Sequence, residues 1–221
     1  MSPEFCPRCE KPLRLCGCAD VRELSTRVSV LFLQHPQEPD KDLGTARLAN
    51  LCLPNSQLRV GLSRPNLAAA LGRPADPKKW VALYLGSGVK ESAALRSSTA
   101  IQLVTKTGTA LPDSDEALRH CEGLIVLDGT WSQAKTLWWR NAWLLKVRRG
   151  ILRPHGPSMY GRLRREPRRE CLSTLESVGL ALTSMGEDHA VEEGLREVFA
   201  RLLERIRAPR PSVSAQTPPT E

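Results

Sequence analysis

The residues best suited to chemistry are Asp128, Gly129 and Thr130, which follow a short apolar run and precede a stretch with helical spacing. The run 124–127 is rich in β-branched side chains, as expected for a buried strand. Where a strand turns tightly into a helix, the carboxyl edge of the sheet and the free N–H groups of the helix face one crevice. Asp128 would place a carboxylate there, Gly129 would allow the turn and Thr130 would cap the helix. On spacing alone, an ordinary capped turn is the more frequent explanation.

The helical stretch that begins at Trp131 carries most of the tryptophans. Trp131 and Trp138, together with Ala134 and Ala142, follow helical spacing, which predicts that most of these rings belong to the core. Trp131 stands next to the turn, where it could stack on a base or an adenine ring. Packing explains its position equally well.

A second polar cluster, Ser173-Thr174-Leu175-Glu176, has the S-x-x-E form of a capping box, which accounts for Ser173 and Glu176 structurally. If the N-terminus of this helix also faces the Asp128 crevice, its free N–H groups and Thr174 could hold a carboxylate. A Gly-rich loop at 86–88 allows the backbone at Gly86 to approach a ligand closely. It is neither a Walker loop nor a G-x-G-x-x-G fingerprint.

Four cysteines near the N-terminus have the spacing C-x2-C-x6-C-x-C, and they are Cys6, Cys9, Cys16 and Cys18. Four thiolates can complete a tetrahedron around zinc, or less often hold an iron–sulfur cluster. A redox C-x-x-C site is the weaker explanation, because such a motif belongs at a strand–helix junction. Four protein ligands would leave no open position, so the metal is expected to be structural. Such a zinc knuckle could also present its basic residues, Arg8, Lys11 and Arg14, to RNA.

The formal net charge of +8 suggests a polyanionic partner. The surplus gathers in a loop-like segment with Pro154, Gly156 and Pro157, and its arginines are Arg148, Arg149, Arg153, Arg162, Arg164, Arg165, Arg168 and Arg169. Arginine suits bidentate contacts to phosphate, so nucleic-acid contact is favoured over a solvated basic loop. Arg47, in a predicted helix at 45–51, is a further candidate for a phosphate contact.

The segments of this chain resemble the DTW-domain family, in their order as well as in their residues. The resemblance rests on DGTW at 128–131, LQHPQE at 33–38, TARL at 45–48, LPN at 53–55, REPR at 165–168, CLSTLE at 171–176 and the cysteine cluster. It extends over about residues 6–206. The loop at Gly86 departs from the family pattern, which often has a proline there.

The resemblance implies a SPOUT-like fold with a knotted C-terminal region. It also implies transfer of the 3-amino-3-carboxypropyl group of S-adenosylmethionine to uridine N3 in tRNA, with methylthioadenosine released. Asp128, Thr130 and Trp131 are then the catalytic candidates, with Asp128 either accepting the N3 proton or orienting a reactant. Cofactor-binding candidates are Ser173, Thr174, Glu176 and Gly86. A methyltransferase using the same cofactor and a non-catalytic zinc-containing RNA-binding protein are the alternatives.

The elements that must position these residues alternate between strand and helix, which predicts an α/β fold with a largely parallel sheet. Strands are expected at 28–34, 60–62, 80–85, 100–104 and 124–127. We expect a zinc knuckle at 1–24, a catalytic domain at 25–207 and a disordered tail at 208–221. No apolar run is long enough for a membrane span, and the N-terminal residues lack the pattern of a signal peptide, so a cytoplasmic protein is expected.

Overall fold

A six-stranded sheet forms the centre of the molecule. The computed structural model describes residues 5–38, 42–84, 99–154, 156–163 and 172–209, without the side chain of Arg162. The strands are β1 (Ser29–Gln34), β2 (Ser56–Val60), β3 (Trp80–Leu83), β4 (Ile101–Val104), β5 (Gly123–Asp128) and β6 (Arg148–Leu152), in the order β2-β1-β5-β3-β6-β4. Neighbouring strands pair in parallel except β4 with β6. The predicted α/β class and largely parallel sheet are confirmed.

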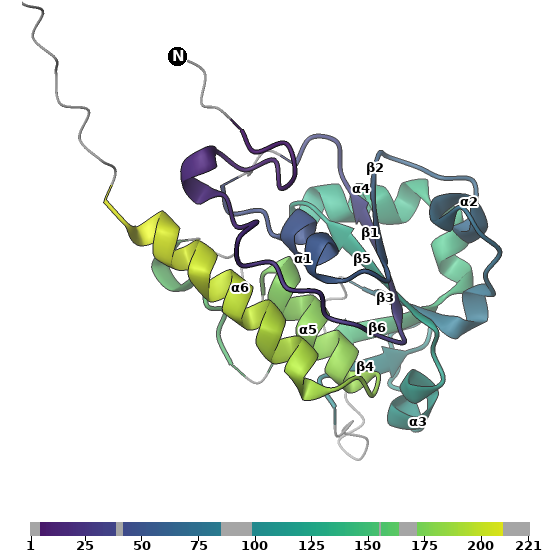
Figure 1. Ribbon diagram of the computed structural model, residues 1–221. Helices are drawn as coiled ribbons and strands as arrows, with labels where there is room; N and C mark the ends of the chain where they lie inside the picture. Colours follow the sequence, from purple (N-terminus) through teal and green to yellow (C-terminus); the bar gives the residue numbers. More distant parts are fainter. Residues whose placement is uncertain (1–4, 39–41, 85–98, 155, 164–171, 210–221) are drawn as a thin grey trace, which may run out of the picture.

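Helices cover both faces of this sheet (Figure 1). One core cluster joins α1 (Ala46–Cys52), α5 (Thr174–Ser184) and α6 (His189–Arg207) to one face. The other cluster joins α2 (Leu67–Leu71), α4 (Trp131–Arg140) and the 3-10 helix η3 (Ala142–Lys146) to the opposite face. The remaining helices are α3 (Ser114–Arg119), η1 (Leu13–Leu15), η2 (Pro77–Lys79) and η4 (Gly161–Leu163). None of the helices in the described ranges has the length and apolar character that a membrane span requires.

The strand order creates a switch point between β1 and β5. After β1 the chain crosses through α1 to β2 on one side, whereas after β5 it crosses through α4 to β6 on the other side. In open α/β sheets, ligands bind beyond the carboxyl ends of strands at such a point. Gln34 and Asp128 are the paired residues at these two ends.

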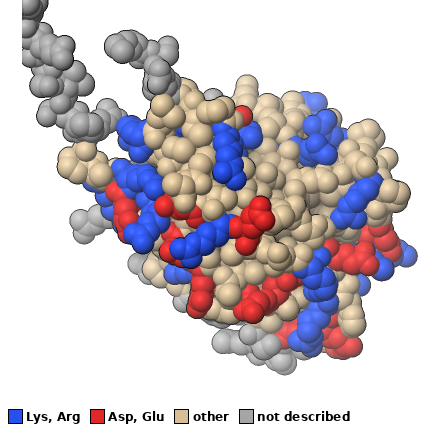
Figure 2. All heavy atoms as spheres, viewed as in Figure 1, with Lys and Arg blue, Asp and Glu red and all other residues tan. Residues whose placement is uncertain are grey.

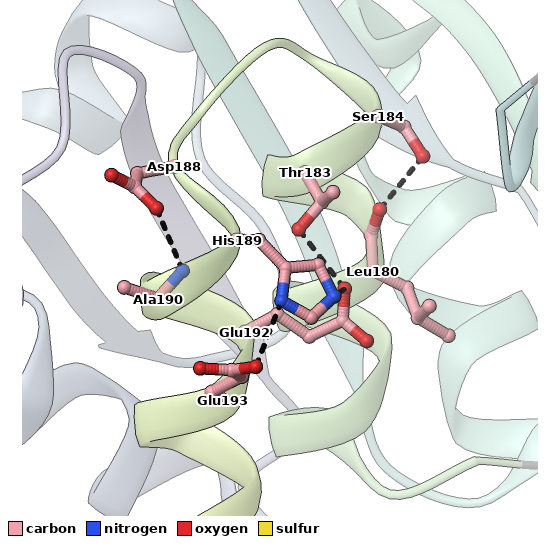
Figure 3. A network of polar contacts seen from close by, with 8 residues as sticks. All are labelled: Leu180, Thr183, Ser184, Asp188, His189, Ala190, Glu192 and Glu193. Atoms are coloured by element: carbon pink, nitrogen blue, oxygen red, sulfur yellow. Dashed lines mark hydrogen bonds and ion pairs between the residues drawn. The ribbon is translucent and has the colours of Figure 1, made fainter.

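The connection between α5 and α6 is held by the polar network in Figure 3. The Thr183 hydroxyl donates to Glu192 at 3.0 Å, and His189 Nδ1 lies 3.2 Å from a Glu193 carboxylate oxygen. Asp188 caps the first turn of α6. The Thr183–Glu192 contact joins α5 to α6, the other two contacts stabilise the start of α6, and α5 in turn reaches the switch point with its N-terminus.

Two parts of the sheet differ from the sequence-based expectation. Residues 148–152, expected to be part of a basic loop, form β6 between β3 and β4. Their sequence lacks an apolar alternation, and Gly150 permits close packing because a Cβ there would lie 2.9 Å from Ile101. The strand expected at 60–62 ends at Val60 instead, where β2 stops. The expected tail lies mostly outside the described residues.

Candidate functional site

The Asp128 carboxylate lies at the switch point, where it is held by two other elements. Its Oδ2 accepts a hydrogen bond from Gln34 Nε2 at 2.8 Å, and its Oδ1 accepts one from the Thr174 hydroxyl at 2.7 Å. The residue is 7% exposed, and no ion pair joins it to a residue in the described part of the chain. Two donors therefore fix the carboxylate, while each oxygen keeps a lone pair for a further donor.

The turn after Asp128 requires glycine. Gly129 has φ +148°, and a Cβ there would lie 2.9 Å from Gln133 Cβ. The Thr130 hydroxyl accepts the N–H of Gln133 at 3.3 Å, and Gln133 Oε1 accepts the N–H of Thr130 at 2.7 Å. The predicted Thr130 cap of α4 is confirmed, and Gln133 also binds the Gln37 carbonyl in the segment after β1.

His35, next to Gln34, supports the same edge of the sheet. Its backbone N–H donates to the Asp128 carbonyl at 3.0 Å, and its Nδ1 accepts the N–H of Gln37 at 3.1 Å. An accepting Nδ1 leaves the proton of the neutral imidazole on Nε2. This buried histidine therefore orders the segment after β1.

The N-terminus of α5 begins with the predicted capping box, which is confirmed. Ser173 and Glu176 are each 1% exposed. The Glu176 carboxylate accepts bonds from the Ser158 hydroxyl, the Met159 N–H and the Ser173 N–H at 2.7–2.9 Å. The Thr174 hydroxyl instead turns to Asp128. Of the four-residue cluster, Thr174 thus belongs to the Asp128 site by direct contact, whereas Glu176 fastens the segment before α5.

Replacing Glu176 with alanine tests this structural role. The change leaves three donors without an acceptor, one buried and two part-buried, so we expect the free energy of unfolding to fall by about 2–5 kcal/mol. Thermal denaturation of the protein alone measures this. If the free energy of unfolding did not change, the structural role would be wrong, and the predicted contact with the cofactor would remain as the role of Glu176.

The four predicted metal ligands converge near the N-terminus. The Sγ atoms of Cys6 and Cys18 lie 3.6 Å apart, those of Cys9 and Cys16 lie 3.7 Å apart, and all four lie within 4.8 Å of one another. Zinc–sulfur bonds of 2.3 Å in a regular tetrahedron separate the sulfurs by about 3.8 Å. Backbone N–H groups of Cys9 and Arg8 lower the pKa of the Cys6 thiol to about 6, whereas burial raises the pKa of the Cys18 thiol. The donor set therefore fits a closed, four-coordinate metal centre.

Lys11 connects this knuckle to the segment that precedes α1. The residue is 2% exposed, and its Nζ donates to the carbonyls of Asp42 and Gly44 at 2.9 and 2.7 Å. Next along the chain, the Thr45 hydroxyl accepts the N–H of Leu175 at 3.3 Å. The suggestion that the knuckle presents Lys11 to RNA is wrong, because this ammonium is buried and binds the segment before α1.

A comparison with protein families decides which group this chain belongs to, since a family model described as the DTW domain matches residues 3–207. The chain belongs to the DTW domain family. Relatives include proteins named tRNA-uridine aminocarboxypropyltransferase 2. That of Macaca fascicularis is 27% identical over 86% of this chain and 59% of its own length, and that of Drosophila melanogaster is 30% identical over 80% and 64%. The chain thus spans about three-fifths of the relatives it matches. No solved structure matches it.

The predicted RNA-contacting arginines whose side chains the structure describes do not form one cluster around Asp128. In the sheet, Arg148 is opposite Val81 of β3, and Val81 is opposite Leu124 of β5. Leu124 precedes Asp128 by four residues. The Nε of Arg148 donates to the Lys78 carbonyl. Arg148 therefore lies at the amino edge of the sheet, roughly 13 Å from the Asp128 edge along the strand direction.

Two of the other predicted RNA-contacting arginines, Arg149 and Arg47, contact side chains of the DTW domain itself. The Arg149 guanidinium lies over the rings of Tyr84 and Trp138, 5.3 and 5.1 Å from their centroids. Arg47 pairs with Glu10 of the knuckle at 2.9 Å. Arg153 follows the carboxyl end of β6. The side chain of Arg162, the residues Arg164, Arg165, Arg168 and Arg169, and Gly86 lie outside the description of the structure.

Gln34 is a site residue that sequence reasoning missed. Its signal was present, because a polar residue ends an apolar strand there just as Asp128 does on β5. What the sequence lacked was the pairing of β1 with β5, which places Gln34 opposite Asp128. Trp131, by contrast, is half-buried at the first position of α4, beside the turn as expected.

Proposed function

We propose that this DTW domain transfers the 3-amino-3-carboxypropyl group of S-adenosylmethionine to N3 of a uridine in tRNA, releasing methylthioadenosine. The observation that carries the proposal is the buried Asp128 carboxylate, held by Gln34 and Thr174 at the switch point. The relatives named tRNA-uridine aminocarboxypropyltransferase support both the enzyme class and the tRNA substrate.

Asp128 is proposed to accept the N3 proton of the target uridine. When bound, S-adenosylmethionine supplies a carbon already activated by the neighbouring sulfonium, so the protein has to align the reactants and remove a proton. The carboxylate suits this role because its two donors come from fixed elements, and it forms no ion pair with a described residue that would compete for the proton. Gln34 and Thr174 act as positioning residues.

The N-terminus of α5 is proposed to receive the carboxylate of the transferred group. Helix N-termini favour anions through their backbone N–H groups and the helix dipole. The Leu175 and Glu176 N–H groups already donate to Thr45 and Ser173, so the backbone N–H of Thr174, the residue that adjoins Asp128, is the donor proposed for this carboxylate. Thr130, Trp131, Ser173, Glu176 and Gly86 remain predicted members of the site.

The finer predictions about this protein also remain proposals. They are the SPOUT-like fold with its knot, the division at 1–24, 25–207 and 208–221, zinc as the metal, cytoplasmic location, and RNA contact by the arginine-rich segment. The closed cysteine cluster supports a structural metal, since four thiolates complete its coordination.

Product analysis tests the reaction. Purified protein is incubated with unmodified tRNA and S-adenosylmethionine, and mass spectrometry identifies the nucleosides and the small-molecule product. We expect aminocarboxypropyl-uridine together with methylthioadenosine. A methylated nucleoside together with S-adenosylhomocysteine would show that the reaction is methyl transfer instead. Binding of tRNA without either product would favour a non-catalytic RNA-binding protein.

Replacing Thr174 with valine tests its positioning role. The variant keeps the shape of the side chain but removes the hydroxyl that donates to Asp128. Hydrogen bonds to charged groups contribute about 1.5–3 kcal/mol, so we expect kcat to fall about 10- to 150-fold. Serine at the same position retains the hydroxyl and should restore most of the rate. Equal losses in the valine and serine variants would argue against a role for this hydrogen bond.

A further inference from the structure

The exposed face of α4 carries the most exposed large hydrophobic side chain in the described part of the chain. Trp139 is 79% exposed, whereas the neighbouring Trp138 and Trp143 are buried. Lys135 precedes Trp139 by four residues, so the two side chains lie on one face of the helix, and Lys135 is also exposed. The helical spacing that places most tryptophans in the core does not apply to this ring.

Contacts of helix α4 place it near the carboxyl edge of the sheet, the edge that holds Asp128. Helix α4 begins three residues after Asp128, and its Trp138 contacts Tyr84 just beyond the end of β3, with ring centroids 4.7 Å apart. At the far end of α4, the Asn141 side chain binds the Leu62 carbonyl and the Arg64 N–H beyond β2. Trp139 therefore lies roughly 12 Å from Trp131 along the helix axis.

The stretch of sequence that contains this face carries only basic charges. Residues 129–165 contain nine lysines and arginines and no acidic residue. Neither Lys135 nor the exposed Arg140 forms an ion pair with a residue in the ranges that the structure describes. By contrast, Figure 2 shows basic and acidic side chains side by side over the α6 surface, where Arg205 pairs with Asp20.

We infer that Trp139, with Lys135 and Arg140, forms a stacking platform for an unpaired base of the RNA substrate, beside the Asp128 site. An exposed aromatic ring among unpaired cations is the combination that binds single-stranded nucleic acid, because the ring stacks on a base and the cations contact phosphates. The inference rests on the proposed function for its choice of tRNA.

A membrane surface is the less favoured occupant. Helices that lie on membranes insert a continuous apolar face into the lipid. The apolar face of α4, formed by Ala134, Leu137 and Trp138, is already buried in the protein. What remains exposed is one aromatic ring with basic and hydroxyl neighbours, which matches a nucleic acid.

Binding of an unmodified tRNA transcript tests this platform in the full chain. The variants are Trp139→Leu, Trp139→Phe and Lys135→Gln, with Arg196→Gln as a control on the exposed surface of α6. Stacking on a base is worth about 1–3 kcal/mol, so Trp139→Leu should weaken the Kd about 5- to 150-fold. Trp139→Phe should retain most of the affinity, Lys135→Gln should weaken binding and its salt dependence, and Arg196→Gln should change neither.

Several results would overturn the inference. Wild-type affinity in Trp139→Leu is one, and equal weakening by Arg196→Gln and Lys135→Gln is another. Loss of binding to anionic vesicles in Trp139→Leu, with tRNA affinity unchanged, would assign the face to membranes. Product formation by the wild-type protein is measured separately. If the wild-type protein modifies tRNA but Trp139→Leu binds tRNA normally, the proposed function stands and the platform is wrong. If Trp139→Leu binds tRNA weakly but the wild-type protein forms no product, the platform stands and the proposed function is wrong.

Discussion

Replacement of Asp128 by asparagine should reduce the rate of the proposed aminocarboxypropyl transfer about 10²- to 10⁴-fold, the usual contribution of a general base. Asparagine keeps the size of the side chain but has one acceptor oxygen in place of two. Its NH2 group would replace one of the two carboxylate oxygens, so it cannot accept both bonds where Gln34 and Thr174 now donate them, and it cannot take up the uridine proton. Single-turnover formation of modified uridine measures this loss.

An exposed aspartate provides the matched control. Asp113 precedes α3 and its side chain makes no capping bond, so Asp113→Asn changes the net charge equally without touching the site. This variant should retain the full rate. Binding of tRNA by Asp128→Asn should stay near the wild-type value. A fully active Asp128→Asn protein would exclude Asp128 as the base.

Replacement of Cys9 by serine should abolish metal binding by the proposed cysteine centre and destabilise the protein. Serine is a poor ligand for zinc, and the remaining three thiolates cannot close the tetrahedron. Because metal binding contributes directly to folding, we expect a loss of about 3 kcal/mol or more, which lowers Tm by about 10 °C. Elemental analysis of the metal content and thermal denaturation measure the two effects.

Cys121 is the matched control for this experiment. It is buried outside the cluster, where its Sγ donates to the Ala117 carbonyl, a bond that serine can also make. Cys121→Ser should therefore retain the metal. If Cys9→Ser kept its metal and its Tm, the cluster would not be a metal centre. Loss of the metal should also slow transfer, because Lys11 fastens the knuckle to the segment before Thr45.

Several features could be predicted from the sequence because they depend on neighbours along the chain. The turn at Gly129, the Thr130 cap and the Ser173–Glu176 capping box involve residues at most four apart. The cysteine cluster also has its ligands within thirteen consecutive residues, so its spacing indicated the shape of the site. The alternation of apolar strands with helices similarly determined the fold class.

Other features were decided by tertiary structure alone. Whether Asp128 meets Gln34 depends on the pairing of β1 with β5, and its contact with Thr174 crosses 46 residues. Strand β6 forms because β3 and β4 supply partners on both sides, although its own sequence resembles a basic loop. Lys11 is buried rather than exposed because two carbonyls of a distant segment accept hydrogen bonds from its ammonium group. Residue types along the chain determined which groups were available for chemistry, whereas long-range packing decided which of them meet, because that depends on the relative positions of elements far apart in sequence.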